Sequence, residues 1–155
     1  MVDEIKVARI RNGTVIDHIS PGQGLNVLKI LGVNENTISS TVIVGMHVSS
    51  NKMASKLKDI VKIEDRELDQ STVDKIALIS PDATIVIIRD YYVAKKFKVE
   101  IGDHVTGLAR CSNPNCITNK GEPICPEFDV ISRNPPVLRC SYCERILSNI
   151  SDNLL

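Results

Sequence analysis

Four of the five cysteines form two closely spaced pairs in the last third of the chain. Cys111 and Cys116 are separated by four residues, and Cys140 and Cys143 by two residues. A tight turn, for which Asn113-Pro114-Asn115 supplies suitable residues, directs two sulfurs toward one point, and paired strands bring two such turns together. The spacing therefore predicts a tetrahedral Zn²⁺ site with four thiolate ligands.

The predicted metal site has no open coordination position, so we expect a structural metal rather than a catalytic one. Arg110, Arg139 and Arg145 lie within two residues of the cysteines and can offset the negative charge of four thiolates. Backbone N–H groups in the turns can also donate hydrogen bonds to the sulfurs. The residues leave open an iron–sulfur cluster, which four thiolates also hold, and free or redox-active thiols. Cys125, away from both pairs, is interpreted as a buried or semi-exposed spare thiol.

No other group of residues points to catalysis. The sequence offers no Ser/His/Asp set, no paired carboxylates and no open metal site. The segment Gly22-Gln23-Gly24 lacks the Gly-Lys-Ser/Thr ending of a phosphate loop and is better explained as the start of a helix. His47 and His104 are interpreted as ordinary strand or surface residues, because the cysteines already complete the metal site. The sequence therefore predicts a protein that is not an enzyme.

The charge balance disfavours nucleic acid as a partner. The chain has 19 Lys and Arg against 19 Asp and Glu, and neither residues 1–100, with 14 against 13, nor residues 101–155, with 5 against 6, form a basic module. Binding to duplex nucleic acid depends on clustered Lys and Arg, and binding to single strands depends on aromatic stacking. Aromatic residues make up only 3% of the chain, so neither mode is favoured.

Hydropathy gives no sign of a membrane or secretory segment. No apolar run approaches the roughly 20 residues that span a bilayer, and the first residues are charged. We expect a cytoplasmic protein without a membrane partner. In a reducing cytosol, clustered cysteines favour a metal over disulfides.

The position of the cysteines also divides the chain into two predicted domains, residues 1–100 and 101–155. All five cysteines follow residue 110, and residues 100–103 have the composition of a turn. The second domain is short, turn-rich and too small to fold readily without a stabilising cross-link such as a bound metal. We expect it to be a small all-β zinc domain.

The first domain has an alternating pattern of strands and helices. β-branched and apolar runs predict strands at about 5–10 (resuming at 14–16), 41–48, 60–63 and 84–88, with residues 92–99 extending the last strand or forming an edge. Helices are expected after Ser20 and Ser71. This order predicts an α+β domain of the ferredoxin-like β-α-β-β-α-β type, with an antiparallel four-stranded sheet and helices on one face.

Capping residues define the ends of both helices. In the first helix, Ser20 is the expected N-cap, Pro21 the first helical residue, Gln23 the partner in a capping box and Gly32 the stop. In the second, Ser71 is the expected N-cap and Pro81 follows the end. The inward faces are expected to contain Leu25, Val27, Leu28, Ile30 and Leu31 in the first helix and Val73, Ile76, Ala77 and Ile79 or Ser80 in the second.

Nearly the whole chain, from about residue 5 to about 150, resembles the family of aspartate carbamoyltransferase regulatory chains. The stretches that carry the resemblance are Gly13-Thr14-Val15-Ile16-Asp17-His18-Ile19, Lys62-Ile63-Glu64, Pro81-x-Ala83-Thr84, Cys111-x4-Cys116-Ile117 and Cys140-x-Tyr142-Cys143-Glu144. The first stretch and the cysteine set together are specific for the family.

The resemblance implies a non-catalytic subunit that regulates pyrimidine nucleotide biosynthesis. The first domain of such chains pairs with a second regulatory chain, and the zinc domain grips the catalytic chain. Three regulatory dimers typically join two catalytic trimers. CTP and ATP compete for one site on the first domain, and some members also respond to UTP.

The resemblance also implies an effector site. Its residues, matched one by one, are Val7, Ala8, Ile10, Asp17, His18, Ile60, Lys62, Val86, Ile88, Tyr91, Val93 and Lys96. Backbone groups of the first three would read the base edge, and Asp17 and His18 would lie near the ribose and phosphates. A carboxylate beside His18 can also hold the tautomer of its imidazole. Lys62, Lys95 and Lys96 would supply cations.

Several positions depart from the family pattern. Val86 replaces an Asn that often helps to recognise the base or ribose, and Ala8 stands where an acidic residue can occur. From these departures we expect a weaker or less selective response to nucleotides. The alternatives that remain are a zinc-ribbon adaptor for nucleic acid and a structural linker without a nucleotide response.

Overall fold

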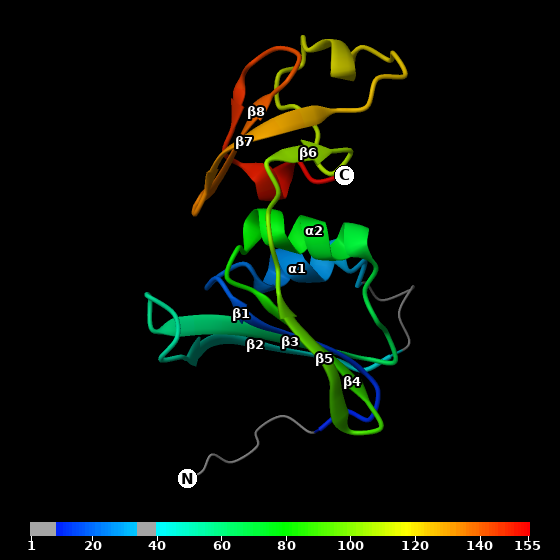
Figure 1. The fold of residues 1–155 in the computed structure, drawn as a ribbon, viewed down its shortest axis with the longest axis vertical. Helices are drawn as coiled ribbons and strands as arrows, with labels where there is room; N and C mark the ends of the chain where they lie inside the picture. The colour runs from blue at the N-terminus through cyan, green and yellow to red at the C-terminus, as the bar shows by residue number, and fades with distance from the viewer. Residues whose placement is uncertain (1–8, 34–39) are drawn as a thin grey trace. The chain divides into compact units, whose positions relative to one another are not determined.

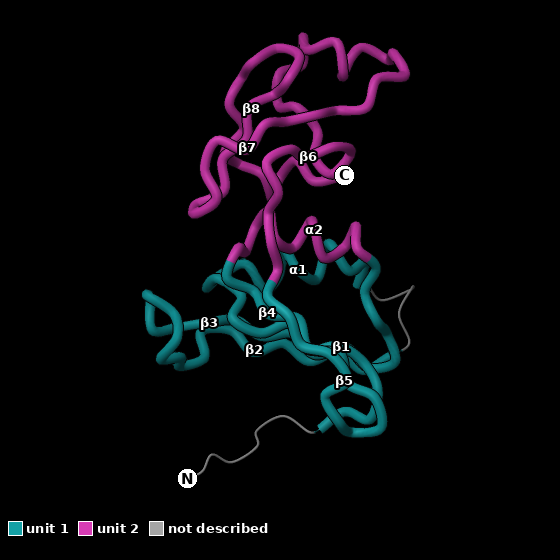
Figure 2. Tube along the Cα trace, in the orientation of Figure 1, with its two compact units in different colours: residues 1–69, 82–98 teal, residues 70–81, 99–155 magenta. Residues whose placement is uncertain are grey.

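The computed structural model describes residues 9–33 and 40–155, which form two compact units (Figure 2). Unit 1 comprises residues 1–69 and 82–98, and unit 2 comprises residues 70–81 and 99–155. The segment 70–81, which lies within the first predicted domain in sequence, thus groups with the C-terminal residues.

Unit 1 is built on a five-stranded antiparallel sheet (Figure 1). Its strands are β1 (Gly13–Ile19), β2 (Val42–Ser49), β3 (Leu57–Glu64), β4 (Thr84–Arg89) and β5 (Tyr92–Lys98), in the order β2-β3-β1-β4-β5. With α1 (Gly24–Ile30) and α2 (Gln70–Ile79), the chain order is β-α-β-β-α-β followed by β5. The predicted α+β class is confirmed, and the residues after 91 form a fifth strand at the edge.

The first strand begins later than the sequence pattern predicted. Residues 5–8 lie outside the described part of the chain, Arg9 and Ile10 are not in a strand, and β1 starts at Gly13. Gly13 has φ +149°, and a Cβ there would lie 2.2 Å from the carbonyl oxygen of Ile63 on β3. This glycine is therefore where β1 joins β3, and not a break between two extended runs.

The two faces of the sheet differ in burial. Along β3, Asp59, Val61 and Ile63 are buried, and along β4, Ile85 and Ile87 are buried. The side chains between them are only partly buried. Figure 1 shows α1 lying over one face of the sheet, where it contacts β2 and β3. Among the described residues, the alternation leaves the opposite face, called the open face below, partly exposed.

The start of α1 differs from the predicted capping box. The N-cap residue is Gln23 rather than Ser20, and it makes no side-chain capping hydrogen bond. The carboxylate of Asp59 on β3 instead accepts hydrogen bonds from the backbone N–H groups of Gly22 and Gly24, both at 2.9 Å. The cap comes from a residue distant in sequence, which local pattern could not reveal.

The apolar face of α1 is narrower than predicted. Val27 and Leu31 are buried as expected, but Leu25 is 55% exposed. The helix ends at Ile30 and is followed by Gly32 with φ +72°, as expected for a glycine stop.

Unit 2 contains α2 and a second antiparallel sheet in the order β6-β7-β8-β9. The strands are β6 (His104–Thr106), β7 (Glu127–Arg133), β8 (Pro136–Cys140) and β9 (Ile146–Leu147), with 3₁₀ turns η1 (Ile117–Asn119) and η2 (Ile150–Asp152). Phe128, Leu138 and Leu147, from three strands of this sheet, are buried. The small C-terminal all-β domain is thus confirmed.

Helix α2 begins at Gln70, before the predicted cap Ser71, and ends at Ile79, before Pro81. The expected residues Val73, Ile76, Ala77 and Ile79 are buried, and so is Leu78. Among the described helices, none has the length and apolar character needed to cross a membrane.

Candidate functional site

The four cysteines of the two predicted pairs converge in unit 2. Their sulfur atoms all lie within 4.8 Å of one another. The Sγ atoms of Cys111 and Cys143 are 3.5 Å apart, and those of Cys116 and Cys140 are 3.7 Å apart. Cys140 ends β8, Cys116 precedes η1, Cys143 lies in a turn, and Cys111 lies in a segment without regular secondary structure. Four sulfurs around one point fit tetrahedral coordination by Zn²⁺.

Backbone and hydroxyl groups around the cluster donate to the sulfurs, as predicted. The N–H of Asn113 lies 3.5 Å from Cys111 Sγ, and the N–H of Tyr142 lies 3.4 Å from Cys140 Sγ. Thr118 Oγ1 lies 3.2 Å from Cys116 Sγ. Such donors stabilise the negative charge that thiolate ligands bring to a metal.

The acidity of the thiols differs across the cluster. Burial raises the pKa of Cys111 to about 12. Burial also acts to raise the pKa of Cys143, but hydrogen bonds, first that of the Arg145 backbone, lower it to about 7. Metal ligation requires thiolates, so a bound cation would hold all four in the deprotonated form and release protons on binding.

Two further predictions about the cluster concern its surroundings. Arg139 forms an ion pair with Asp129 at 3.8 Å, so its charge is shared with a carboxylate. Cys125 is not part of the cluster, as expected of a spare thiol, but it is exposed rather than buried or semi-exposed.

A second group of predicted residues shares the open face of the sheet in unit 1. Directly paired residues of neighbouring strands point to the same face. Lys62 pairs with Val15, Val15 with Val86, and Val86 with Lys96. Two lysines thus flank a valine pair in one row across four strands.

The neighbouring rows add most of the remaining predicted residues. On one side, Ile88 pairs with Val93, and on the other, Asp17 pairs with Thr84, which pairs with Lys98. Ile60 lies on the same face because it is two residues from Lys62. Strand register therefore brings seven predicted residues to one surface: Asp17, Ile60, Lys62, Val86, Ile88, Val93 and Lys96.

The other predicted residues have different settings. Val7 and Ala8 lie outside the described residues. Ile10 is 5% exposed and packs beside Gly13 rather than in a strand. Tyr91 lies in the β4–β5 turn with φ +70°, where it is 52% exposed and its ring lies 5.6 Å from the guanidinium of Arg9.

Asp17 has a different partner from the one expected. Its carboxylate pairs with the ammonium of Lys58 at 2.9 Å, and both side chains are mostly buried. Burial acts to raise the pKa of Asp17, but the bonds from Lys58 and from the N–H of His18 outweigh it and lower the pKa. The imidazole Nδ1 of His18 lies 3.3 Å from Thr84 Oγ1. Thr84, not Asp17, is therefore the residue beside the imidazole nitrogen.

A cavity of about 370 Å³ adjoins this surface. It is lined by His18, Lys52, Met53, Ala54, Asp82, Thr84, Lys96 and Lys98. Three ammonium groups against one carboxylate make it suited to a polyanion. Lys95 is not part of it: it pairs with Ile87 and points to the other face, beside the ring of Phe97.

Sequence reasoning missed four polar residues of this region, namely Lys52, Lys58, Thr84 and Lys98. Lys98 had a usable signal, since it follows Lys96 by two residues on a strand and so shares its face. Lys58 stands in the same relation to Ile60. Lys52 comes from the β2–β3 connection, where no local pattern indicates direction.

Known proteins match both parts of the chain. Residues 5–100 match the family model described as the allosteric domain of the aspartate carbamoyltransferase regulatory chain, and residues 103–151 match the model for its metal binding domain.

Individual relatives are similar along almost the entire length. The aspartate carbamoyltransferase regulatory chain of Methanothrix thermoacetophila is 55% identical over 153 residues, covering 98% of this chain and 97% of its own. That of Methanothermobacter thermautotrophicus is 54% identical over 144 residues, covering 93% and 90%. That of Thermoplasma volcanium is 50% identical over 144 residues, covering 93% of each chain.

Proposed function

This chain belongs to the family of aspartate carbamoyltransferase regulatory chains, and from the surface described above we propose that it binds CTP and ATP on the open face of its first sheet. As a member of that family it is a non-catalytic regulatory chain with an allosteric domain and a metal-binding domain, and it associates with the catalytic chain. The alternative of a nucleic-acid adaptor is thereby set aside.

The observation that carries the nucleotide proposal is the shared face of the predicted residues. Seven of them, from four strands, meet on one surface, although they are spread from residue 17 to residue 96 of the sequence. The surface has an apolar part at Ile88 and Val93, a cationic row at Lys62 and Lys96, and a cation-lined cavity beside it. A nucleotide triphosphate needs these three features together.

The orientation of the nucleotide follows from the distribution of charge. The triphosphate would enter the cavity with His18, Lys96 and Lys98, where cations outnumber the single Asp82. The base would lie over Ile88 and Val93, next to the exposed Tyr91. UTP, which carries the same triphosphate, would use the same cavity.

We assign the metal in the second domain as one Zn²⁺, held by Cys111, Cys116, Cys140 and Cys143. Four sulfur ligands favour Zn²⁺ among the common metals of the cytoplasm, in which we place this chain. The metal would contribute folding energy rather than chemistry, because four protein ligands leave no site for substrate.

A second regulatory chain would pair through the edge strand β2. Met46 and Val48 on this strand are 40% and 39% exposed, and β2 has no neighbouring strand on its outer side in the described chain. The opposite edge, β5, carries Lys95, Lys96 and Lys98, which discourage strand addition. The edge without lysines, β2, is therefore the one suited to a dimer.

The regulatory effect would arise from a population shift. A nucleotide that binds more tightly to one of two states of the assembled enzyme favours that state by the difference in binding free energy, typically about 1–3 kcal/mol.

The decisive experiment is an aspartate saturation curve of the cognate catalytic trimer with this chain and Zn²⁺ added. We expect a sigmoidal curve that moves when CTP or ATP is present. A complex that forms but is unaffected by nucleotides would contradict effector binding and favour a structural linker.

Two adjacent lysines provide a matched pair of variants for the nucleotide site. Lys96→Gln removes a cation from the cavity, whereas Lys95→Gln removes one from the opposite face of the same strand. By calorimetry, we expect Lys96→Gln to weaken CTP and ATP binding by roughly tenfold or more, the effect of losing one charge-assisted bond. Equal effects of the two variants would show that only overall charge matters.

Selectivity between CTP and ATP is expected to be low. Val86, at the centre of the row between Lys62 and Lys96, has no side-chain group to bond with a base or ribose. We expect calorimetry to give dissociation constants for the two nucleotides within about tenfold of each other. A much larger preference for one of them would contradict this expectation and point to backbone readout.

A further inference from the structure

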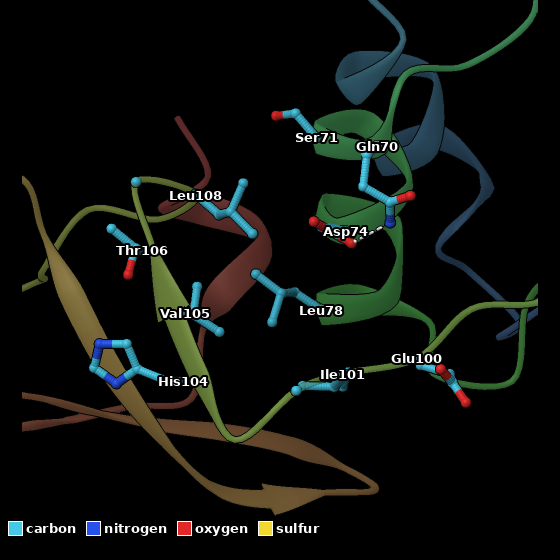
Figure 3. Close-up of a pocket in the computed structure, with 12 residues that line it drawn as sticks. Gln70, Ser71, Asp74, Leu78, Glu100, Ile101, His104, Val105, Thr106 and Leu108 are labelled. Carbon is cyan, nitrogen blue, oxygen red and sulfur yellow. Dashed lines mark hydrogen bonds between the residues drawn. The ribbon is translucent and has the colours of Figure 1, made fainter.

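The sheet of unit 2 has a buried face and an exposed face. Val105, Phe128 and Leu138 are buried on one side. On the other, His104 pairs with Asp129, and Asp129 with Arg139. Figure 3 shows Val105 directed toward Leu78 of α2, beside a cavity of about 570 Å³, with the imidazole of His104 on the opposite side of β6.

Both ring nitrogens of His104 face carboxylates of β7. Nδ1 lies 3.1 Å from Asp129 Oδ1, and Nε2 lies 2.8 Å from Glu127 Oε1. A neutral imidazole has only one N–H, so it can donate to only one of these carboxylates. The arrangement is fully satisfied only by the imidazolium form.

The contact extends to the metal-binding turn. The other carboxylate oxygen of Glu127, Oε2, accepts a hydrogen bond from the hydroxyl of Tyr142 at 3.2 Å. Tyr142 lies between Cys140 and Cys143, and its side chain is 43% exposed. One proton on His104 thus links β6 and β7 with the turn that bears two of the ligands.

We propose that His104 is a pH-sensitive latch, which in its protonated form joins β6 to β7 and, through Glu127, holds Tyr142 against the sheet. The other charged groups around it are accounted for. Arg139 on β8 pairs with Asp129 at 3.8 Å, and Asp103, next to His104 in the chain, pairs with Arg133 on β7. Neither removes a carboxylate from the imidazole.

The pH range of the latch follows from the direction of two shifts. The bond to Glu127, and then that to Asp129, raise the pKa of His104 above its ordinary 6.5. A raised pKa in the folded state stabilises the fold fully below the unfolded value, and this contribution is lost as pH rises through the folded value. The hydrogen bonds from His104 and then Tyr142 lower the pKa of Glu127. The pH below which protonation of Glu127 would open the latch is therefore lower than the ordinary pKa of a Glu. The latch is therefore closed between the lowered pKa of Glu127 and the raised pKa of His104, and it opens as the pH rises above the latter.

The test is a pH titration of the full-length, Zn²⁺-loaded chain by NMR, observing histidine and tyrosine rings. The chain has only three His and three Tyr, and His104→Gln and Tyr142→Phe assign the relevant signals. We expect His104 to titrate with a midpoint above 6.5 and the ring signals of Tyr142 to follow the same midpoint. A midpoint at or below 6.5, or Tyr142 signals that are flat across it, would overturn the latch.

Variants of the two carboxylates separate the latch from a general effect of charge. Glu127→Gln and Asp129→Asn should each lower the His104 midpoint, and only Glu127→Gln should also uncouple Tyr142 from it. Asp152→Asn, at another position of unit 2, is the control and should leave both unchanged. An unchanged midpoint in both carboxylate variants would show that the latch does not exist.

Discussion

Asp59 is a fully buried carboxylate at a junction of three elements of unit 1. Its Oδ2 accepts from Gly22 and Gly24 before and at the start of α1, and its Oδ1 accepts from the N–H of His47 on β2 at 2.9 Å. His47 has φ +56°, at the irregularity in the β2–β3 pairing. A single side chain on β3 thus fixes a loop, a helix start and a neighbouring strand.

We therefore expect Asp59→Asn to lower the free energy of unfolding by about 2–4 kcal/mol, because the amide retains one acceptor and turns an N–H₂ group toward N–H donors. Urea unfolding followed by circular dichroism measures the loss. The matched control is Asp65→Asn at an exposed position, which should change stability by less than about 0.5 kcal/mol. A similarly small effect of Asp59→Asn would mean that the loop and strand are held by other contacts.

At the scale of elements, Gly13 determines where β1 can enter the sheet. β1 lies between β3 and β4, so its first residue is flanked on both sides. The 2.2 Å gap to the Ile63 carbonyl cannot hold a methyl group without a shift of backbone, and φ +149° is a conformation that side chains disfavour.

Gly13→Ala should destabilise the chain by about 2–4 kcal/mol through this clash and the backbone strain. Thermal unfolding compared with Gly102→Ala provides the control, since the nearest atom to a Cβ at Gly102 is 3.9 Å away. Equal melting temperatures for the two variants would imply that β1 shifts to make room.

The elements that sequence predicted well are those with a strong local pattern. The β-branched runs at Val42–Ser49 and Thr84–Arg89 both form strands, and Pro81 and Gly32 end their helices by local geometry. The cap of α1 could not be predicted in this way, because the Asp59 carboxylate lies 35 residues from Gly24. Burial of the helix face also depended on tertiary contacts, so Leu25 was misplaced.

At the scale of the whole molecule, the cysteine cluster and the proposed nucleotide face differ in how far the sequence determines them. Cys-x4-Cys and Cys-x2-Cys carry their geometry in their spacing, so all four ligands could be named in advance. The proposed nucleotide face depends on the pairing register between strands that are far apart in sequence. The family resemblance identified its residues. The position of Lys58 and the opposite orientation of Lys95 follow only from the strand pairing, and the position of Lys52 follows only from the lining of the cavity.

The division into two units separates the cysteine cluster from the proposed nucleotide face. All four cysteines belong to unit 2, and all described residues of the proposed nucleotide face belong to unit 1. Because the binding energy of a structural metal is largely folding energy, loss of one ligand should unfold the sheet around Cys140 while leaving the sheet of unit 1 folded.

We therefore expect Cys140→Ser to abolish association with catalytic trimers while nucleotide binding persists. Gel filtration with catalytic trimers measures the first, and calorimetry with CTP or ATP measures the second. Cys125→Ser, at the exposed cysteine outside the cluster, is the matched control and should behave as wild type in both. Normal co-elution of Cys140→Ser with the trimers would show that the metal domain is not what grips the catalytic chain. Loss of nucleotide binding together with assembly would show instead that the two units do not fold independently.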